Sequence, residues 1–170
     1  MTRTLPLPVI SRREASVKIN SDFRDLLRNL NEAGVRYLIV GGYAVMVHTE
    51  PRYTKDLDVW VHNSAQNSHC VVEALKKFGA PLEHDGITAE TFAEKQVVYQ
   101  IGVVPVRIDI LTEITGVEFS NAWKERVPST FFGVPVHFIS LDDLVTNKQA
   151  LGRSSDLKDL RNPKNAKSSN

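Results

Sequence analysis

Three aspartates in two short apolar segments are the residues of this chain whose type and spacing best suit catalysis. Asp56 and Asp58 lie in "TKDLDVWV", and Asp109 lies in "VRIDIL". Branched and aromatic residues dominate both segments, which predicts a strand in each. Side chains two residues apart in a strand project from the same face. Asp56 and Asp58 therefore face the same way, while Leu57 between them faces the core.

Two carboxylates held close together repel each other, and a buried carboxylate needs a positive partner. A divalent cation would satisfy the Asp56–Asp58 pair, because hard oxygen ligands suit Mg²⁺ or Mn²⁺. If the two predicted strands are neighbours, Asp109 completes a cluster of three carboxylates able to hold two cations. Two cations about 4 Å apart activate an attacking oxygen and stabilise a leaving oxygen in an in-line displacement.

Two other interpretations of these aspartates stay open at the level of the sequence. Asp56 and Asp58 are also what the solvent-facing side of an edge strand would carry. In the second segment Arg107 shares a face with Asp109, so a surface strand with Arg107 paired to an acid explains it as well. An Asp-x-Asp pair taken alone does not decide among these interpretations.

A pair of glycines precedes the first two aspartates. The run "VRYLIV" has the length and composition of a strand, Gly41 and Gly42 end it, and "YAVMVHTE" predicts a short helix that stops before Pro51. A strand, glycines and a helix start allow backbone N–H groups to approach a phosphate closely. The pattern is not a P-loop, which needs Gly-Lys-Ser/Thr, and it lacks the third glycine of a dinucleotide-binding fingerprint.

These segments resemble a known family. "GGYAVMVHTEPRYTKDLDVWV" with the later "RIDIL" looks like the nucleotidyltransferase fold of the polymerase-beta superfamily. That fold is marked by a Gly-Gly or Gly-Ser turn, a short helix, an Asp-x-Asp/Glu strand and a third acid on a following strand. The run "RYTKDLD" and the late "NKQALGRSSDLKDL" are similar to segments of the AbiEii toxin and related minimal nucleotidyltransferases. The resemblance covers roughly Ser21 to Leu160.

The resemblance implies roles for particular residues. The metal ligands would be Asp56, Asp58 and Asp109, with Asp109 also acting as general base for the acceptor hydroxyl. The nucleotide-binding residues would be Gly41, Gly42, Arg52, Thr54 and Lys148.

Within the nucleotide-binding set, the glycines would cradle the phosphates, Thr54 would touch one and Arg52 would neutralise one. Lys148 would reach the triphosphate as a mobile charge, although a solvated lysine on an amphipathic helix explains it equally well. The late Arg153 matches the family segment or is simply a charge at a helix end. One departure is Gly42, where relatives often carry a serine that contacts phosphate.

The rest of the chain predicts an α/β (α+β) fold with a mixed β-sheet and helices packed on it. Helices are expected over residues 20–33, 64–79 and 141–152 and near residues 116–127, with another beginning at residue 154. Paired strands are expected over residues 93–114, with a further strand at 134–140. We predict a flexible arm over residues 1–18, a single nucleotidyltransferase-like domain over 19–162 and a disordered tail over 163–170.

Composition restricts the remaining function classes. The formal net charge is +1, so no overall basic bias favours a nucleic-acid partner. The single cysteine, Cys70, excludes an internal disulfide and, with no segment long enough to span a bilayer, predicts a cytoplasmic protein. The histidines lack metal-binding spacing, and no Gly-x-Ser-x-Gly elbow indicates a serine hydrolase.

The sequence therefore predicts a Mg²⁺-dependent nucleotidyltransferase that moves an NMP from an NTP to a hydroxyl group. The acceptor stays open among RNA such as a tRNA end, a protein and a small molecule. The AbiEii likeness implies a place in a toxin–antitoxin or phage-defence system, with a cognate toxin or antitoxin as partner. The alternative is a non-catalytic protein of the same fold that docks such a partner.

Overall fold

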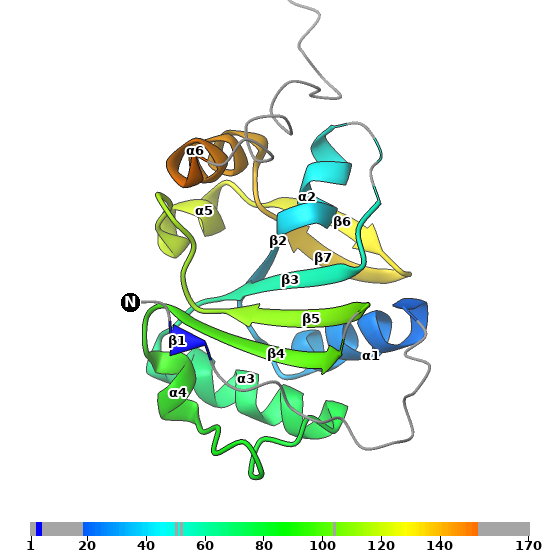
Figure 1. The fold of residues 1–170 in the computed structure, drawn as a ribbon, viewed down its shortest axis with the longest axis vertical. Helices are drawn as coiled ribbons and strands as arrows, with labels where there is room; N and C mark the ends of the chain where they lie inside the picture. The colour runs from blue at the N-terminus through cyan, green and yellow to red at the C-terminus, as the bar shows by residue number, and fades with distance from the viewer. Residues whose placement is uncertain (1–2, 5–18, 50, 52, 104, 153–170) are drawn as a thin grey trace, which may run out of the picture.

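The computed structural model describes residues 3–4, 19–49, 51, 53–103 and 105–152. Within these residues the chain forms one mixed sheet with helices packed on both of its faces (Figure 1), which confirms the predicted fold class. The strands are β1 (Arg3–Thr4), β2 (Tyr37–Val40), β3 (Asp56–Val61), β4 (Val97–Val103), β5 (Val106–Leu111), β6 (Val127–Phe131) and β7 (Val134–Phe138). The helices are α1 (Ile19–Glu32), α2 (Gly41–His48), α3 (Ala65–Phe78), α4 (Ala89–Ala93), α5 (Phe119–Lys124) and α6 (Leu141–Leu151).

The strand order places β3 in the interior of the sheet. The seven strands follow the order β1-β4-β5-β3-β2-β7-β6. Strand β3 pairs antiparallel with β2 and parallel with β5, and β4 and β5 form an antiparallel hairpin. The interpretation of Asp56 and Asp58 as residues of an edge strand is therefore wrong, because β3 has a neighbour on each side.

Alternation along the central strands gives the sheet two different faces. Helices α1, α3 and α4 cover one face of the sheet (Figure 1). Val59 and Tyr99 are fully buried on this face, and the ring of Phe92 in α4 packs edge-on against the ring of Tyr99. On the opposite face, Trp60 packs edge-on against Phe119 of α5. Helices α2 and α6 lie on this second face as well. The residues of β3 with even numbers, the two aspartates included, thus point to this second face.

Capping residues set the ends of the two best-predicted helices. The Ser64 hydroxyl accepts a hydrogen bond from the backbone N–H of Asn67, and Gly79 ends α3 with a φ of 93°. At α6 the Ser140 hydroxyl accepts from the backbone N–H of Asp143. A side-chain acceptor at the first position and a left-handed glycine after the last turn satisfy groups that a helix leaves unpaired. These predicted helices are confirmed.

Three short elements were not predicted, namely β1, β6 and α4. Each has at most five residues, too few to show a period in the sequence. Strand β1 belongs to the predicted arm, and its two residues pair in parallel with β4. The remainder of that arm, the helix expected from residue 154 and the tail over 163–170 lie outside the described residues.

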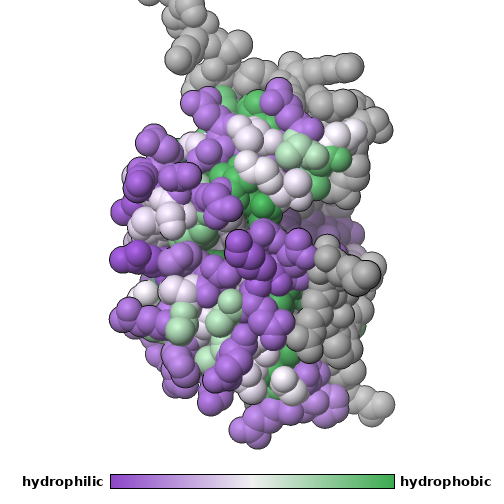
Figure 2. Space-filling view, turned by 90° about the vertical axis from the view of Figure 1, so that its left-hand side faces the viewer, coloured by the Kyte–Doolittle hydropathy of each residue, from purple (hydrophilic) through white to green (hydrophobic). Residues whose placement is uncertain are grey.

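Figure 2 shows the side of the molecule on which the segment between β5 and α5 lies. Hydrophilic residues cover most of this side, and a small group of hydrophobic residues lies at its centre. In the ranges that the structure describes, no helix combines the length and the apolar character needed to cross a bilayer.

Candidate active site

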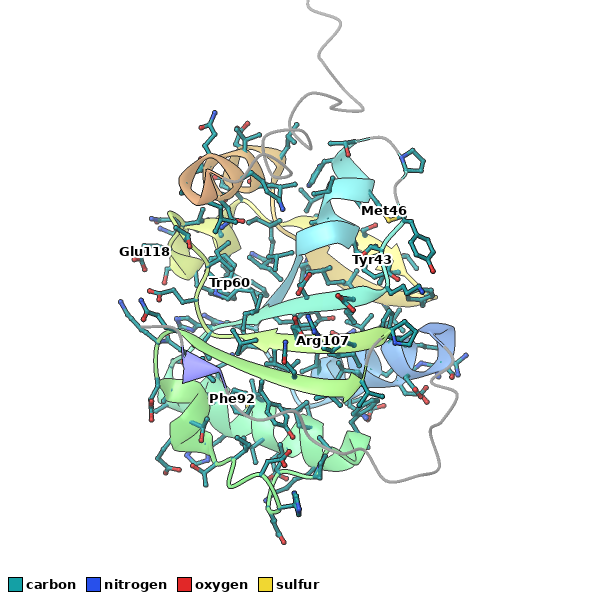
Figure 3. The ribbon with its side chains drawn as sticks, viewed as in Figure 1. Tyr43, Met46, Trp60, Phe92, Arg107 and Glu118 are labelled. Carbon is teal, nitrogen blue, oxygen red and sulfur yellow. The ribbon has the colours of Figure 1, made fainter. Side chains whose placement is uncertain are left out.

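The register of β3 and β5 brings the three aspartates together. Asp58 lies opposite Asp109, and Asp56 lies opposite Arg107. Opposite residues on neighbouring strands share a face, so these four side chains form one patch on the second face of the sheet. Figure 3 shows Arg107 on β5, at the middle of the sheet. The neighbourhood on which the predicted three-carboxylate cluster depended is therefore present.

Arg107 lies at the centre of this patch. Its Nε donates to Oδ1 of Asp109 at 2.9 Å, and its Nη2 donates to Oδ2 of the same carboxylate at 3.2 Å. The same Nη2 lies 3.8 Å from Oδ2 of Asp56. The prediction that Arg107 pairs with an acid is confirmed, although β5 is an interior strand and not a surface one. Arg107 thus supplies positive charge to two of the three carboxylates.

The surroundings of Asp58 disfavour the charged form of its carboxylate. Burial, followed by the charges of Asp109 and Asp56, raises its pKa from 3.8 to about 7, against the opposing charges of Arg107 and Lys148. Burial also raises the pKa of Asp109, although the hydrogen bond and charge of Arg107 oppose the rise. A carboxylate with this pKa is poorly satisfied by the protein alone and would gain from a bound cation.

Helix α2 begins at the glycine pair and approaches β3 without an intervening side chain. Gly41 has a φ of 66°, and a Cβ placed on it would lie 2.0 Å from Oδ2 of Asp58. Only glycine fits, because it tolerates the left-handed backbone and leaves room for the carboxylate. The helix therefore starts at Gly41, two residues before the predicted start. Its first N–H groups, which a helix leaves unpaired, lie beside the aspartate cluster.

Thr54 occupies the space in front of the second glycine. A Cβ on Gly42 would lie 2.7 Å from the Thr54 hydroxyl oxygen, and that hydroxyl lies 3.5 Å from the backbone oxygen of Asp56. A serine at position 42, which is frequent in the superfamily that the chain resembles, would collide with Thr54. The hydroxyl near the helix start thus comes from Thr54. The predicted partner Arg52 lies outside the described residues.

Lys148 reaches the cluster from the far end of the chain. It is the last basic residue of α6, it is 9% exposed, and its charge acts on Asp58. Burial of this kind contradicts the interpretation of Lys148 as a solvated lysine on an amphipathic helix. The neighbouring Asn147 is also buried, and its side-chain amide donates to the backbone oxygen of Thr115 at 2.9 Å. Helix α6 is therefore held where Lys148 faces the acids.

One polar residue of the patch was not predicted. Gln100 of β4 lies opposite Asp109, and its side chain hydrogen-bonds that carboxylate. The signal was present in the sequence: folding "VVYQIGVVPVRIDIL" about its Val-Pro turn places Gln100 across from Asp109. His48, which follows the glycine pair in α2, contacts the backbone oxygen of Ile139 at 2.7 Å and so has a structural role.

The donor set fits a hard divalent cation better than it fits any softer metal. Carboxylate oxygens of Asp56, Asp58 and Asp109 lie on one face, and burial, with the charges of the other two acids, raises the pKa of Asp58. Among the described residues, however, no group of three His, Cys, Asp or Glu side chains is arranged so that it could hold a metal ion as it stands. Arg107 engages both oxygens of the Asp109 carboxylate, so a cation that bound there would compete with this ion pair.

The charge on Asp58 should make the metal-free protein less stable at high pH. The pKa of Asp58 is higher in the folded chain than its ordinary value of 3.8, so the folded state keeps the proton up to about pH 7. The free energy of unfolding therefore falls as the pH rises from the ordinary pKa of 3.8 to the folded-state pKa of about 7. We expect Asp58→Asn to stabilise the protein in EDTA, with a gain larger by roughly 3 kcal/mol at pH 8 than at pH 5.

Urea unfolding of both proteins at the two pH values measures this difference. Asp142→Asn, which changes an exposed aspartate in the first turn of α6, is the matched control and should show no such dependence. An Asp58→Asn gain that is equal at pH 5 and pH 8 would contradict the raised pKa. Addition of Mg²⁺ should stabilise the wild type and leave Asp58→Asn unchanged.

A helix that starts on a glycine pair, set against an Asp-x-Asp strand with a third acid on the adjacent parallel strand, is consistent with a nucleotidyltransferase-like fold. Residues 16–169 match the family model described as "Nucleotidyltransferase of unknown function (DUF6036)", and the chain belongs to this family. A search of curated proteins finds no match to the chain.

Proposed function

We propose that the chain transfers an NMP from an NTP to a hydroxyl group of an acceptor in a reaction that depends on Mg²⁺. The acceptor oxygen forms a bond to the α-phosphorus while the bond to the bridging oxygen breaks, and pyrophosphate leaves. The observation that carries this proposal is the register that sets Asp58 opposite Asp109 in front of Gly41. Family membership supports the class of reaction, and the aspartates support the use of a metal.

The three aspartates would hold the cations, whose charge neutralises the reacting phosphate and activates the attacking oxygen. Asp109 would accept the proton of the acceptor hydroxyl. Burial favours this role because it raises the pKa of the Asp109 carboxyl and so makes it a better base. Arg107 and Gln100 fix the orientation of that carboxylate through their hydrogen bonds. Catalysis of this kind depends on positioning and charge stabilisation.

The triphosphate would lie at the start of α2. The N–H groups of the first turn and the partial positive charge of the helix end attract a phosphate, and the absence of side chains at Gly41 and Gly42 permits close approach. The Thr54 hydroxyl lies beside this helix start, and Lys148 supplies a positive charge near Asp58. In this proposal the leaving pyrophosphate would lie on the α2 side of the aspartates.

Incubation with each of four α-labelled NTPs tests the proposal, with Mg²⁺, total RNA and cell lysate supplied as sources of acceptor. We expect one labelled product that requires both Mg²⁺ and Asp58. Calorimetry with NTP and Mg²⁺ is the companion measurement, because a catalytic site should bind the two together. Absence of joint binding and of any labelled product would contradict the proposal.

The non-catalytic alternative has one structural observation in its favour. Arg107 already neutralises part of the cluster, so these acids are partly satisfied without a metal. In that case the protein would dock a partner, and the AbiEii likeness of "RYTKDLD" points to a toxin or antitoxin as that partner. A docking protein should bind neither NTP nor Mg²⁺ at this patch, which distinguishes it from the enzyme in the same calorimetric experiment.

Replacing Lys148 should weaken nucleotide binding. We expect Lys148→Ala to raise the KM for NTP by about tenfold, because one charge-assisted contact to phosphate is worth roughly 1.5–3 kcal/mol. The exposed neighbour Gln149→Ala should leave KM unchanged. Initial rates over a range of NTP concentrations measure both variants. An unaltered KM in Lys148→Ala would remove this residue from the nucleotide site.

A further inference from the structure

A cavity lies beside the aspartate patch and has no role in the reaction described so far. Its volume is about 560 Å³, which suits a small ligand. Trp60 of β3 and Val98 of β4 line its inner part. The segment after β5 and the start of α5 line its rim, from Thr112 to Phe119.

The cavity opens on the same face of the sheet as the aspartates. Trp60 lies opposite Leu111, which lies opposite Val98. On this face of the sheet, that row follows the row of Asp58 and Asp109, two residues further along the strands. Two residues along a strand correspond to about 7 Å. In Figure 3, Trp60 and Glu118 lie on the α5 side of β3. A ligand in the cavity would therefore lie within reach of the carboxylates.

The position relative to α2 suits the acceptor. In an in-line displacement the attacking and leaving oxygens lie on opposite sides of the phosphorus. The pyrophosphate would leave toward the start of α2, which packs on β2 and β3. The lining of the cavity comes from β3, β4, the segment after β5 and the start of α5, with no residue of α2, and Asp109 on the neighbouring row of that face would take the acceptor proton.

The rim of the cavity is held in place by the rest of the fold. Asn147 of α6 donates to the backbone oxygen of Thr115, and Ile114 pairs with Val117 across a tight turn. A Cβ on Gly116 would lie 2.8 Å from Cβ of Ala150, so this turn packs directly on α6. The same helix carries Lys148, which ties the cavity rim and the nucleotide side of the site to one element.

The chemistry of the lining indicates the class of acceptor. Glu113, Glu118 and Lys95 line the cavity, so carboxylates outnumber cations there. A nucleic-acid end would call for Lys and Arg along its phosphates and for exposed aromatic rings under its bases. The two aromatic side chains of the lining are buried instead, Trp60 at 1% and Phe119 at 7% exposure. Amide and hydroxyl side chains also line the cavity, from Asn63, Gln96, Thr112 and Thr115, and the remaining lining is apolar or glycine, from Val98, Ile114, Gly116 and Val117.

We propose that this cavity is the acceptor site and that it takes a small polyhydroxylated molecule carrying an ammonium group. This inference rests on the proposed function and specifies its substrate class. Glu113 and Glu118 bind the ammonium group, and the amide and hydroxyl side chains bind the ligand's hydroxyl groups. One ligand hydroxyl lies toward Asp109, gives up its proton there and bonds to the α-phosphorus as pyrophosphate leaves.

Matched sugars test the ligand class without requiring catalysis. Glucosamine dimers and trimers differ from cellobiose and cellotriose in the amine at each ring, so calorimetry of each with the full chain isolates the ammonium contribution. We expect the amine-bearing sugars to bind at least about tenfold more tightly, as expected for one charge-assisted contact. Equal affinity for both series, or no binding of either, would overturn the proposal.

Variants locate the binding. Glu113→Gln and Glu118→Gln should each reduce the preference for the amine by about tenfold, while Glu125→Gln, at the end of α5 and outside the cavity, should preserve it. An unchanged preference in both cavity variants would overturn the assignment. Binding of NTP and Mg²⁺ by the same proteins separates a failure of the proposed function from a failure of the acceptor inference. If the wild type does not bind NTP and Mg²⁺, the proposed function fails. If this binding is retained while only RNA or protein becomes labelled, the acceptor inference alone fails.

Discussion

Asp58→Asn is expected to abolish Mg²⁺-dependent transfer of label from NTP while leaving the fold intact. Asp58 lies between Asp109 on β5 and the start of α2. Loss of its charge removes a metal ligand, and several kcal/mol of charge stabilisation corresponds to a loss of about a thousandfold or more in rate. Label incorporation in the wild type and the variant, at saturating Mg²⁺ and NTP, measures the loss.

The control for this experiment is Asp142→Asn, which removes an equal charge at an exposed position of α6. Circular dichroism and urea unfolding should show that both variants fold, and Asp58→Asn should be the more stable at pH 8. Loss of transfer combined with a gain in stability would identify Asp58 as a residue kept for function, since active-site groups often reduce stability. A wild-type rate in Asp58→Asn would remove metal-dependent transfer at this patch.

The part of the site that follows from local pattern could be predicted from the sequence. Period-two alternation put Asp56 and Asp58 on one face, and the glycine pair marked where a helix begins beside them. The burial of one face of β3 also has a local cause, because Leu57, Val59 and Val61 are apolar and fully buried. These features depend on residues within a few positions of one another.

The remaining features depend on contacts between distant segments. Nothing near Lys148 in the sequence shows that α6 would pack on the turn at Gly116 and so bring this lysine to Asp58. The bidentate contact between Arg107 and Asp109 depends on side-chain conformation, which alternation alone does not determine. The cavity has no motif at all, because its lining comes from several separate segments.

Arg107 changes where a cation is expected to bind in the aspartate patch. The sequence predicted a cluster of carboxylates in need of a cation, and the structure shows that Arg107 already partly serves that need. Asp58 receives the least of this charge, since the contacts of Arg107 go to Asp109 and Asp56. The raised pKa of Asp58 is consistent with that geometry. A cation should therefore bind first where Asp58 contributes a ligand.

Gly41→Ala is expected to damage both the fold and the site, and Gly34→Ala is its matched control. Both glycines have nearly the same backbone, with φ of 66° and 69°. An added Cβ at Gly34 meets nothing within 4 Å, whereas at Gly41 it would lie 2.0 Å from Oδ2 of Asp58. Gly34→Ala should lower the free energy of unfolding by about 1–2 kcal/mol, which is the usual cost of a left-handed alanine.

Gly41→Ala should lower it by roughly 2 kcal/mol more and abolish joint binding of NTP and Mg²⁺, because either α2 or Asp58 must move. The double variant Gly41→Ala/Asp58→Ala tests the cause, since it removes the oxygen with which the new methyl group collides. We expect it to recover stability relative to Gly41→Ala, with a coupling energy of about 1–3 kcal/mol, and to stay inactive. Equal destabilisation by Gly41→Ala and Gly34→Ala in urea unfolding would show that α2 does not approach Asp58 so closely. The close approach of this helix to that carboxylate is what makes a shared phosphate and metal site possible.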